Sequence, residues 1–113
     1  ITAGNPPTNA VTILKDNDRI GSVVWIESPN VKDIFNNLKE SLLAAFSPNV
    51  KDLKDETKVE PNSPVRNELT FLDPGLSSDR LTFIRVRERL MEFHTAVGKE
   101  AEMKAAMEGL AKL

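Results

Sequence analysis

The chain has 113 residues and a formal net charge of −2; 40% of its residues are apolar and 28% are charged. These proportions are typical of a soluble globular protein, and the length predicts that residues 1–113 form a single domain. The lack of cysteine excludes disulfides and thiolate chemistry, and the apolar runs are too short to span a membrane. No segment has the excess of Lys and Arg that phosphate backbones attract.

The chain begins at Ile1 rather than at Met. We therefore expect either a processed chain, from which an export or organelle-import segment has been removed, or a fragment of a longer protein. The compartment itself is not indicated, because cysteine-free chains occur in every compartment.

The first quarter of the chain predicts an extended arm followed by a β-hairpin. Residues 1–9 contain two consecutive prolines, which favour extended geometry and block a helix. Residues 11–14 and 19–27 are rich in β-branched and aromatic side chains, and the Asp-Asn-Asp turn between them tolerates left-handed backbone. Gly21 within the second run indicates a bulge.

A helix is predicted directly after the hairpin. Ser28 can cap this helix, Pro29 suits its first position, and Asp33 lies near its positive end. Ser47 and the proline that follows it end the helix. Its apolar face consists of Val31, Ile34, Phe35, Leu38, Leu42, Ala45 and Phe46.

Residues 48–66 are predicted to form a long polar connection. Seven of the ten residues from 51 to 60 are charged, and two prolines follow. Connections of this length are either mobile or held by a neighbouring surface. The sextet Ser-Pro-Asn-Val-Lys-Asp occurs at 28–33 and again at 47–52. Only the first copy leads into an apolar face, so the sextet indicates two similar helix starts rather than a repeat architecture.

The second half of the chain predicts one strand and two helices. Residues 68–73 favour a strand, and a Pro-Gly pair ends it. A helix is expected from Ser77 or Ser78 to Gly98, because five apolar residues recur at spacings of 3, 4, 3 and 4. These residues are Phe83, Val86, Leu90, Phe93 and Val97. Residues 99–113 are rich in Ala, Glu, Lys and Met and predict a last amphipathic helix.

The stretch 81–87 has a competing interpretation. Its Thr, Phe, Ile and Val residues favour a sheet, so it could form a fourth strand. We prefer the helix, because the five-residue stripe would not keep to one face of a strand. The predicted fold is therefore α+β. It has a small antiparallel sheet of three strands, or four if 81–87 is extended, with an N-terminal hairpin and about three packed helices.

Few residues indicate reactive chemistry. His94 is the one histidine, and a partly exposed boundary position accounts for it better than a general base or a metal ligand. Asp16 and Asp18 resemble the start of a calcium loop, but the strand-like flanks favour a simple turn. We expect no metal site, no cofactor and no enzymatic activity.

Five of the six arginines lie between 66 and 89, and these five leave two interpretations open. Arginine forks suit phosphate or carboxylate recognition, whereas the interleaved Glu88 and Glu92 favour an ion-pair network. If 81–87 is a strand, Arg85, Arg87 and Arg89 would share one face, and an anion site would gain support.

Because few residues are suited to catalysis, we expect a protein-binding or assembly module. It would be a structural subunit of a larger complex, such as a virion, a secretion machine or an organellar assembly. The partner would be another protein or a second copy of this chain. The residues expected at the contact are Trp25, Arg85, Arg89, Met103, Met107 and Leu110. The alternative is nucleic-acid or anion binding through the Arg80–Arg89 cluster.

Overall fold

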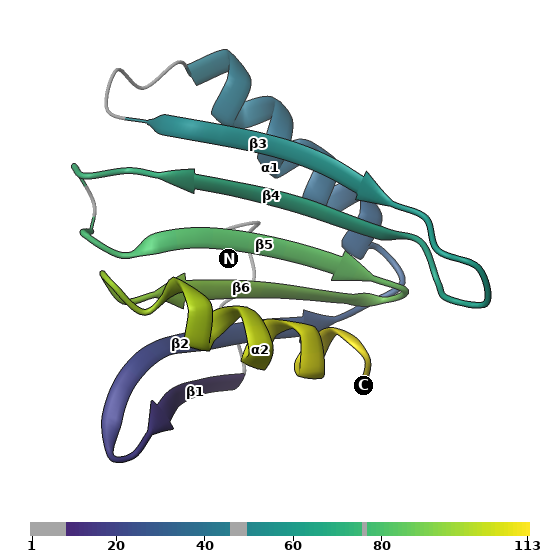
Figure 1. Cartoon of the computed structure of the whole chain (residues 1–113). Helices are drawn as coiled ribbons and strands as arrows, with labels where there is room; N and C mark the ends of the chain where they lie inside the picture. The colour runs from purple at the N-terminus through teal and green to yellow at the C-terminus, as the bar shows by residue number, and fades with distance from the viewer. Residues whose placement is uncertain (1–8, 46–49, 76) are drawn as a thin grey trace.

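The computed structural model describes residues 9–45, 50–75 and 77–113. These residues form a six-stranded antiparallel sheet in the order β1-β2-β6-β5-β4-β3, with one helix on each face (Figure 1). The strands are β1 (Asn9–Lys15), β2 (Asp18–Glu27), β3 (Lys51–Lys58), β4 (Arg66–Leu72), β5 (Arg80–Val86) and β6 (Arg89–Thr95). The helices are α1 (Val31–Ala45) and α2 (Glu100–Ala111).

The observed fold corrects the prediction of three or four strands and three helices. Residues 77–98, expected as a helix, form the β5–β6 hairpin instead. The apolar stripe is divided between the two faces: Phe83 and Leu90 lie under α1, Val86 and Phe93 lie under α2, and Val97 is exposed. Because helices cover both faces, β5 is buried almost continuously and lacks the alternation typical of a strand.

The polar segment 48–66 is also corrected. It contains the edge strand β3, which pairs with β4 and is followed by the loop 59–65. Six of the eight residues in β3 are charged, and most of them are exposed. Because of this composition, the strand lacks the apolar alternation by which strands are predicted. The same composition is typical of edge strands, whose charges prevent further strands from pairing.

The N-terminal hairpin is confirmed, with β1 paired antiparallel to β2. Its register shifts between Ile13 and Leu14, so that Ile20 is the extra residue of a bulge next to Gly21. The bulge explains why Ile20 and Val23 are both buried on the α2 side although they lie three residues apart. The predicted arm lies outside the described residues up to residue 8, and Asn9 already belongs to β1.

Gly21 is required by the close approach of three elements. A Cβ atom at this position would collide with the backbone oxygen of His94 and would lie 2.7 Å from Sδ of Met103. Glycine therefore allows β2 to lie against β6 and α2 at the same time.

Two apolar cores lie on opposite faces of the sheet. On the α1 side, Phe71 and Phe83 stack with their ring centroids 6.2 Å apart. The buried residues of this core are Val31, Phe35, Leu69, Phe71, Leu81, Phe83 and Leu90. The buried residues of the α2 core are Ile20, Val23, Ile84, Val86, Met91, Phe93, Met103 and Ala111.

Three further elements confirm the sequence prediction. The helix after the hairpin is α1, but it begins at Val31 and not at Pro29. The Ser28 hydroxyl accepts a hydrogen bond from the Asn30 amide in the turn before it. The last predicted helix is α2, and the strand predicted at 68–73 is β4. Phe46, assigned to the apolar face of the first helix, lies outside the described residues. Within the described part of the chain, neither helix has the length and apolar character needed to cross a membrane.

Candidate functional site

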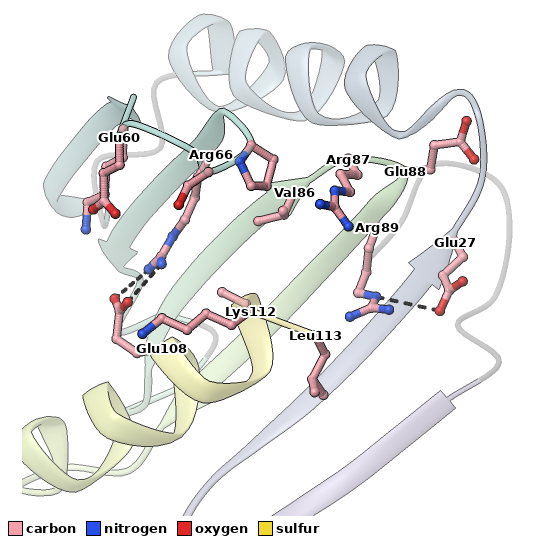
Figure 2. A pocket seen from close by; sticks show the side chains of 14 residues that line it. Glu27, Glu60, Arg66, Val86, Arg87, Glu88, Arg89, Glu108, Lys112 and Leu113 are labelled. Carbon is pink, nitrogen blue, oxygen red and sulfur yellow. Dashed lines mark hydrogen bonds and ion pairs between the residues drawn. The ribbon is translucent and has the colours of Figure 1, made fainter.

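A hollow of about 600 Å³ opens at one end of the sheet (Figure 2). It is formed by the end of β2, the loop between β3 and β4, the β5–β6 turn and the last residues of α2. Its lining residues are Glu27, Lys58, Glu60, Ser63, Pro64, Arg66, Val86, Arg87, Glu88, Arg89, Glu108, Ala111, Lys112 and Leu113. We call this site the arginine hollow.

Arg66 forms one wall of the arginine hollow. Its guanidinium donates to both carboxylate oxygens of Glu108, at 3.0 and 2.7 Å, and to Glu68 at 2.9 Å. The side chain is only 14% exposed, so these charge-assisted bonds offset its burial. The hydrogen bond from Arg66 holds the pKa of Glu108 below its usual value, and the same bond raises the pKa of Arg66 against the effect of burial. The pair fixes α2 to β4.

Arg87 and Arg89 lie across the hollow from Arg66, on either side of Glu88 in the β5–β6 turn (Figure 2). Arg87 has a left-handed backbone with φ of +53°. Two hydrogen bonds hold this turn in place: Arg85 Nη1 donates to the Arg87 carbonyl at 3.0 Å, and the Ser28 amide donates to the Glu88 carbonyl at 2.9 Å. The turn is therefore bonded to β5 and to the end of β2.

Two arginines of the arginine hollow each have a buried guanidinium nitrogen without a hydrogen-bond partner among the described residues. Arg89 Nε lies 3.6 Å from Glu27 Oε1, an ion pair too long for a hydrogen bond. Within the described part of the chain, Nε of Arg89 and Nε of Arg66 are buried and have no hydrogen-bond partner. Each of these Nε–H groups can only donate a hydrogen bond. Because both nitrogen atoms are buried, neither is open to a ligand in the hollow.

The charges that line the hollow are nearly balanced. The cations are Lys58, Arg66, Arg87, Arg89 and Lys112, and the anions are Glu27, Glu60, Glu88 and Glu108. One excess cation suits a ligand with a single carboxylate or similar anion, whereas a polyanion would meet the glutamates.

The structure separates the arginines that the sequence groups together. Arg85 is 9% exposed on the α1 side, where its Nε donates to Asn67 Oδ1 at 2.8 Å. Arg89 pairs in register with Val86 on the α2 side, so the two arginines lie on opposite faces. Arg80 pairs with Asp52 at 2.5 Å. The shared face expected for an extended 81–89 stretch is therefore wrong, because the chain reverses at Arg87 and Glu88.

The remaining residues predicted for partner contact lie on the α2 side of the sheet. Met103 is fully buried in the core. Trp25, Met107 and Leu110 are half-buried and pack against that core. Of the six predicted contact residues, only Arg89 lines the arginine hollow.

Sequence reasoning did not identify Lys58, Glu108 or Lys112 as site residues. These residues approach Arg66 and Arg89 only through the pairing of β3 with β4 and the docking of α2. No pattern in the sequence indicates that these three charges meet, because Lys58 lies inside the predicted connection and Glu108 inside the predicted last helix.

His94 lies outside the hollow. Its Nε2 is 2.7 Å from Glu92 Oε2, and its side chain is partly buried. Burial by itself raises the pKa of Glu92, but the contacts of this carboxylate, the one with His94 among them, bring its pKa below the usual value. Among the described residues, no three His, Asp or Glu side chains are grouped so that they could hold a metal ion. The Asp16–Asp18 stretch forms the β1–β2 turn, where Asp16 and Asn17 have positive φ.

Comparison with known proteins adds no relative. No family model matches the chain, and no curated protein or solved structure matches it significantly.

Proposed function

We propose that this chain is a non-catalytic protein-binding module of a larger assembly, and that the arginine hollow receives a carboxylate-bearing segment of its partner. The observation that carries the proposal is the exposed Arg87, which lies beside Arg89 on the wall of one hollow (Figure 2). A carboxylate presents two acceptor oxygens and matches a guanidinium fork.

The rigidity of the hollow supports binding. Arg66 is held by Glu68 and Glu108, and the backbone of the β5–β6 turn is held by Arg85 and Ser28. Donors held in place before binding lose less conformational freedom when a ligand arrives. A small number of contacts with these fixed groups would then supply the affinity for the partner.

The mixed charge favours a protein partner over a nucleic acid. Four glutamates line the same hollow as the five cations and would repel a run of phosphates. The Arg80–Arg89 cluster offers no continuous basic surface, because Arg80 is paired with Asp52 and Arg85 is buried. Nucleic-acid binding through that cluster is therefore the weaker alternative.

The lining also favours binding over catalysis. It has arginines, lysines and glutamates, one serine and no histidine. Residues of this kind orient an anion, and a serine nucleophile would need an adjacent base to act.

The proposal is tested by placing a photoreactive phenylalanine analogue at Arg87 and cross-linking in cells of the organism from which the chain comes. The control carries the analogue at Val97, which is exposed in the turn between β6 and α2. We expect one discrete protein adduct from position 87, none from position 97, and loss of the adduct when Arg89→Ala is added. Mass spectrometry then identifies the partner peptide.

The binding affinity of the partner peptide gives the quantitative test. Arg89→Ala should weaken it at least about tenfold, the size expected for loss of a charge-assisted hydrogen bond. Arg19→Ala removes an exposed arginine paired with Asp79 elsewhere and should leave affinity unchanged. Equal cross-linking from both positions, or salt-sensitive binding of a single-stranded oligonucleotide instead of the peptide, would contradict the proposal.

A further inference from the structure

The two edges of the sheet differ in composition. At one edge, β3 carries six charged residues out of eight, and its pairing is irregular between Lys51 and Lys54, where Asp52 has a positive φ. Such features discourage a further strand. At the other edge, β1 has a single charge, Lys15, among seven residues. It leaves Val11 47% and Leu14 58% exposed.

The outer edge of β1 has no partner strand within the described residues, which end the sheet at this strand (Figure 1). A strand of this length with β-branched residues and one charge is a surface on which another strand can pair. We propose that β1 pairs antiparallel with β1 of a second copy of this chain, so that one continuous sheet runs through a two-fold symmetric dimer.

The sequence of β1 is complementary to itself. When two copies overlap fully, with Thr12 on the two-fold axis, Val11 of one copy lies opposite Ile13 of the second. Thr12 lies opposite Thr12, and Lys15 lies opposite the uncharged Asn9. β-branched pairs and Thr–Thr pairs stabilise antiparallel strands, and this register brings no like charges together. The strand is therefore suited to a second copy of itself.

The charged edge strand β3 limits the assembly to a dimer. Head-to-tail association would place β1 against β3, but the irregular register and the dense charge of β3 oppose a regular ladder there. A two-fold pairing uses the same strand from both copies and closes on itself. No residue of β1 lines the arginine hollow, so the dimer and the proposed function can fail separately.

The first test measures mass in solution by sedimentation over a range of protein concentrations. Strand pairing over seven residues makes a small interface, so we expect a concentration-dependent rise from the 12.5 kDa monomer to twice that mass. The double variant Val11→Lys and Leu14→Lys should stay monomeric, because it places charges along the pairing edge. The control Val59→Lys and Val97→Lys adds the same charge at exposed apolar sites away from β1 and should still dimerise.

The second test exploits the absence of cysteine in the chain. Directly opposed residues of antiparallel strands lie within the Cα separation that a disulfide spans. Thr12→Cys should therefore give a disulfide-linked dimer on mild oxidation, and Val59→Cys should not. A monomer at every concentration, a dimer that survives the β1 lysines, or equal cross-linking at positions 12 and 59 would overturn the proposal. A dimer that persists in Arg89→Ala shows that its interface is separate from the arginine hollow.

Discussion

At the scale of single residues, Arg66 and Gly21 are mostly buried at positions where the surrounding atoms leave little freedom for another side chain. Arg66 is mostly buried and depends on carboxylates from β4 and α2 for its partners. Gly21 occupies a position where backbone and side-chain atoms leave no room for a Cβ atom. Both positions connect elements that are distant in sequence, so substitutions there should affect the whole fold.

Glu108→Gln tests the ion pair with Arg66. At pH 7 the variant should unfold about 1 kcal/mol more easily, a modest figure because the carboxylate is partly exposed and screened by solvent. Because the folded-state pKa of Glu108 is lowered, its contribution is present above the ordinary glutamate pKa and is lost as pH falls through the folded-state value. Urea unfolding should show a smaller difference from the parent at pH 3 than at pH 7.

The matched control for this measurement is Glu40→Gln, which changes an exposed glutamate of α1. It should leave the free energy of unfolding within about 0.5 kcal/mol of the parent at both pH values. If Glu108→Gln were as destabilising at pH 3 as at pH 7, the ion pair would not be the cause.

Gly21→Ala tests the close packing around β2. The added methyl group would strike β6 backbone and the Met103 side chain, so we expect a loss of about 2–3 kcal/mol in the free energy of unfolding. Gly109→Ala adds the same methyl group inside α2, where nothing lies within 4 Å. It should stabilise the protein by up to about 1 kcal/mol, because alanine favours a helix. Thermal unfolding of both variants should show that Gly21→Ala lowers the stability of the protein and Gly109→Ala raises it.

At the scale of elements, each helix covers one face of the sheet and owes its position to a few buried side chains. Phe35 of α1 is fully buried between the helix and the sheet, and Met103 of α2 has the same role on the opposite face. The helices thus stabilise the sheet from both sides.

Phe35→Ala should cost about 3–5 kcal/mol of unfolding free energy, because it removes a large side chain from a packed core and leaves a cavity. Lys32→Ala changes an exposed residue of the same helix and should be close to neutral. Chemical denaturation followed by Trp25 fluorescence measures both variants. A small effect of Phe35→Ala would mean that α1 does not contribute to the cooperative core.

The sequence predicted elements well where one face is polar and poorly where both faces are covered. The N-terminal hairpin, α1, β4 and α2 carry local signals such as turn residues, capping residues and amphipathic spacing. β5 lacks alternation because Leu81 and Phe83 face one helix while Ile84 and Val86 face the other. A charged edge strand such as β3 has no apolar signal. The arginine cluster of the sequence indicated Arg66, Arg87 and Arg89 of the arginine hollow, but its other walls depend on strand pairing and on the docking of α2.

At the scale of the whole molecule, the two helices leave the edges and ends of the sheet as the places where the chain can meet others. The arginine hollow occupies one end, and β1 forms the unprotected edge. A protein that binds a partner at the end and a second copy at the edge can do both at once. Such an arrangement supports the proposal that the chain is a subunit of a larger assembly.

The strand order also determines when the molecule can fold. The β1–β2 hairpin contains the first two of the six described strands to be synthesised, and it joins the rest of the sheet through β6, the last of these six. Closing this long loop is slow compared with pairing of neighbours. The hairpin must therefore wait with its apolar side chains exposed until residues 89–95 have emerged, and it is vulnerable to aggregation during that interval. A chain stopped before β6 would leave its first strands permanently without a place in the sheet.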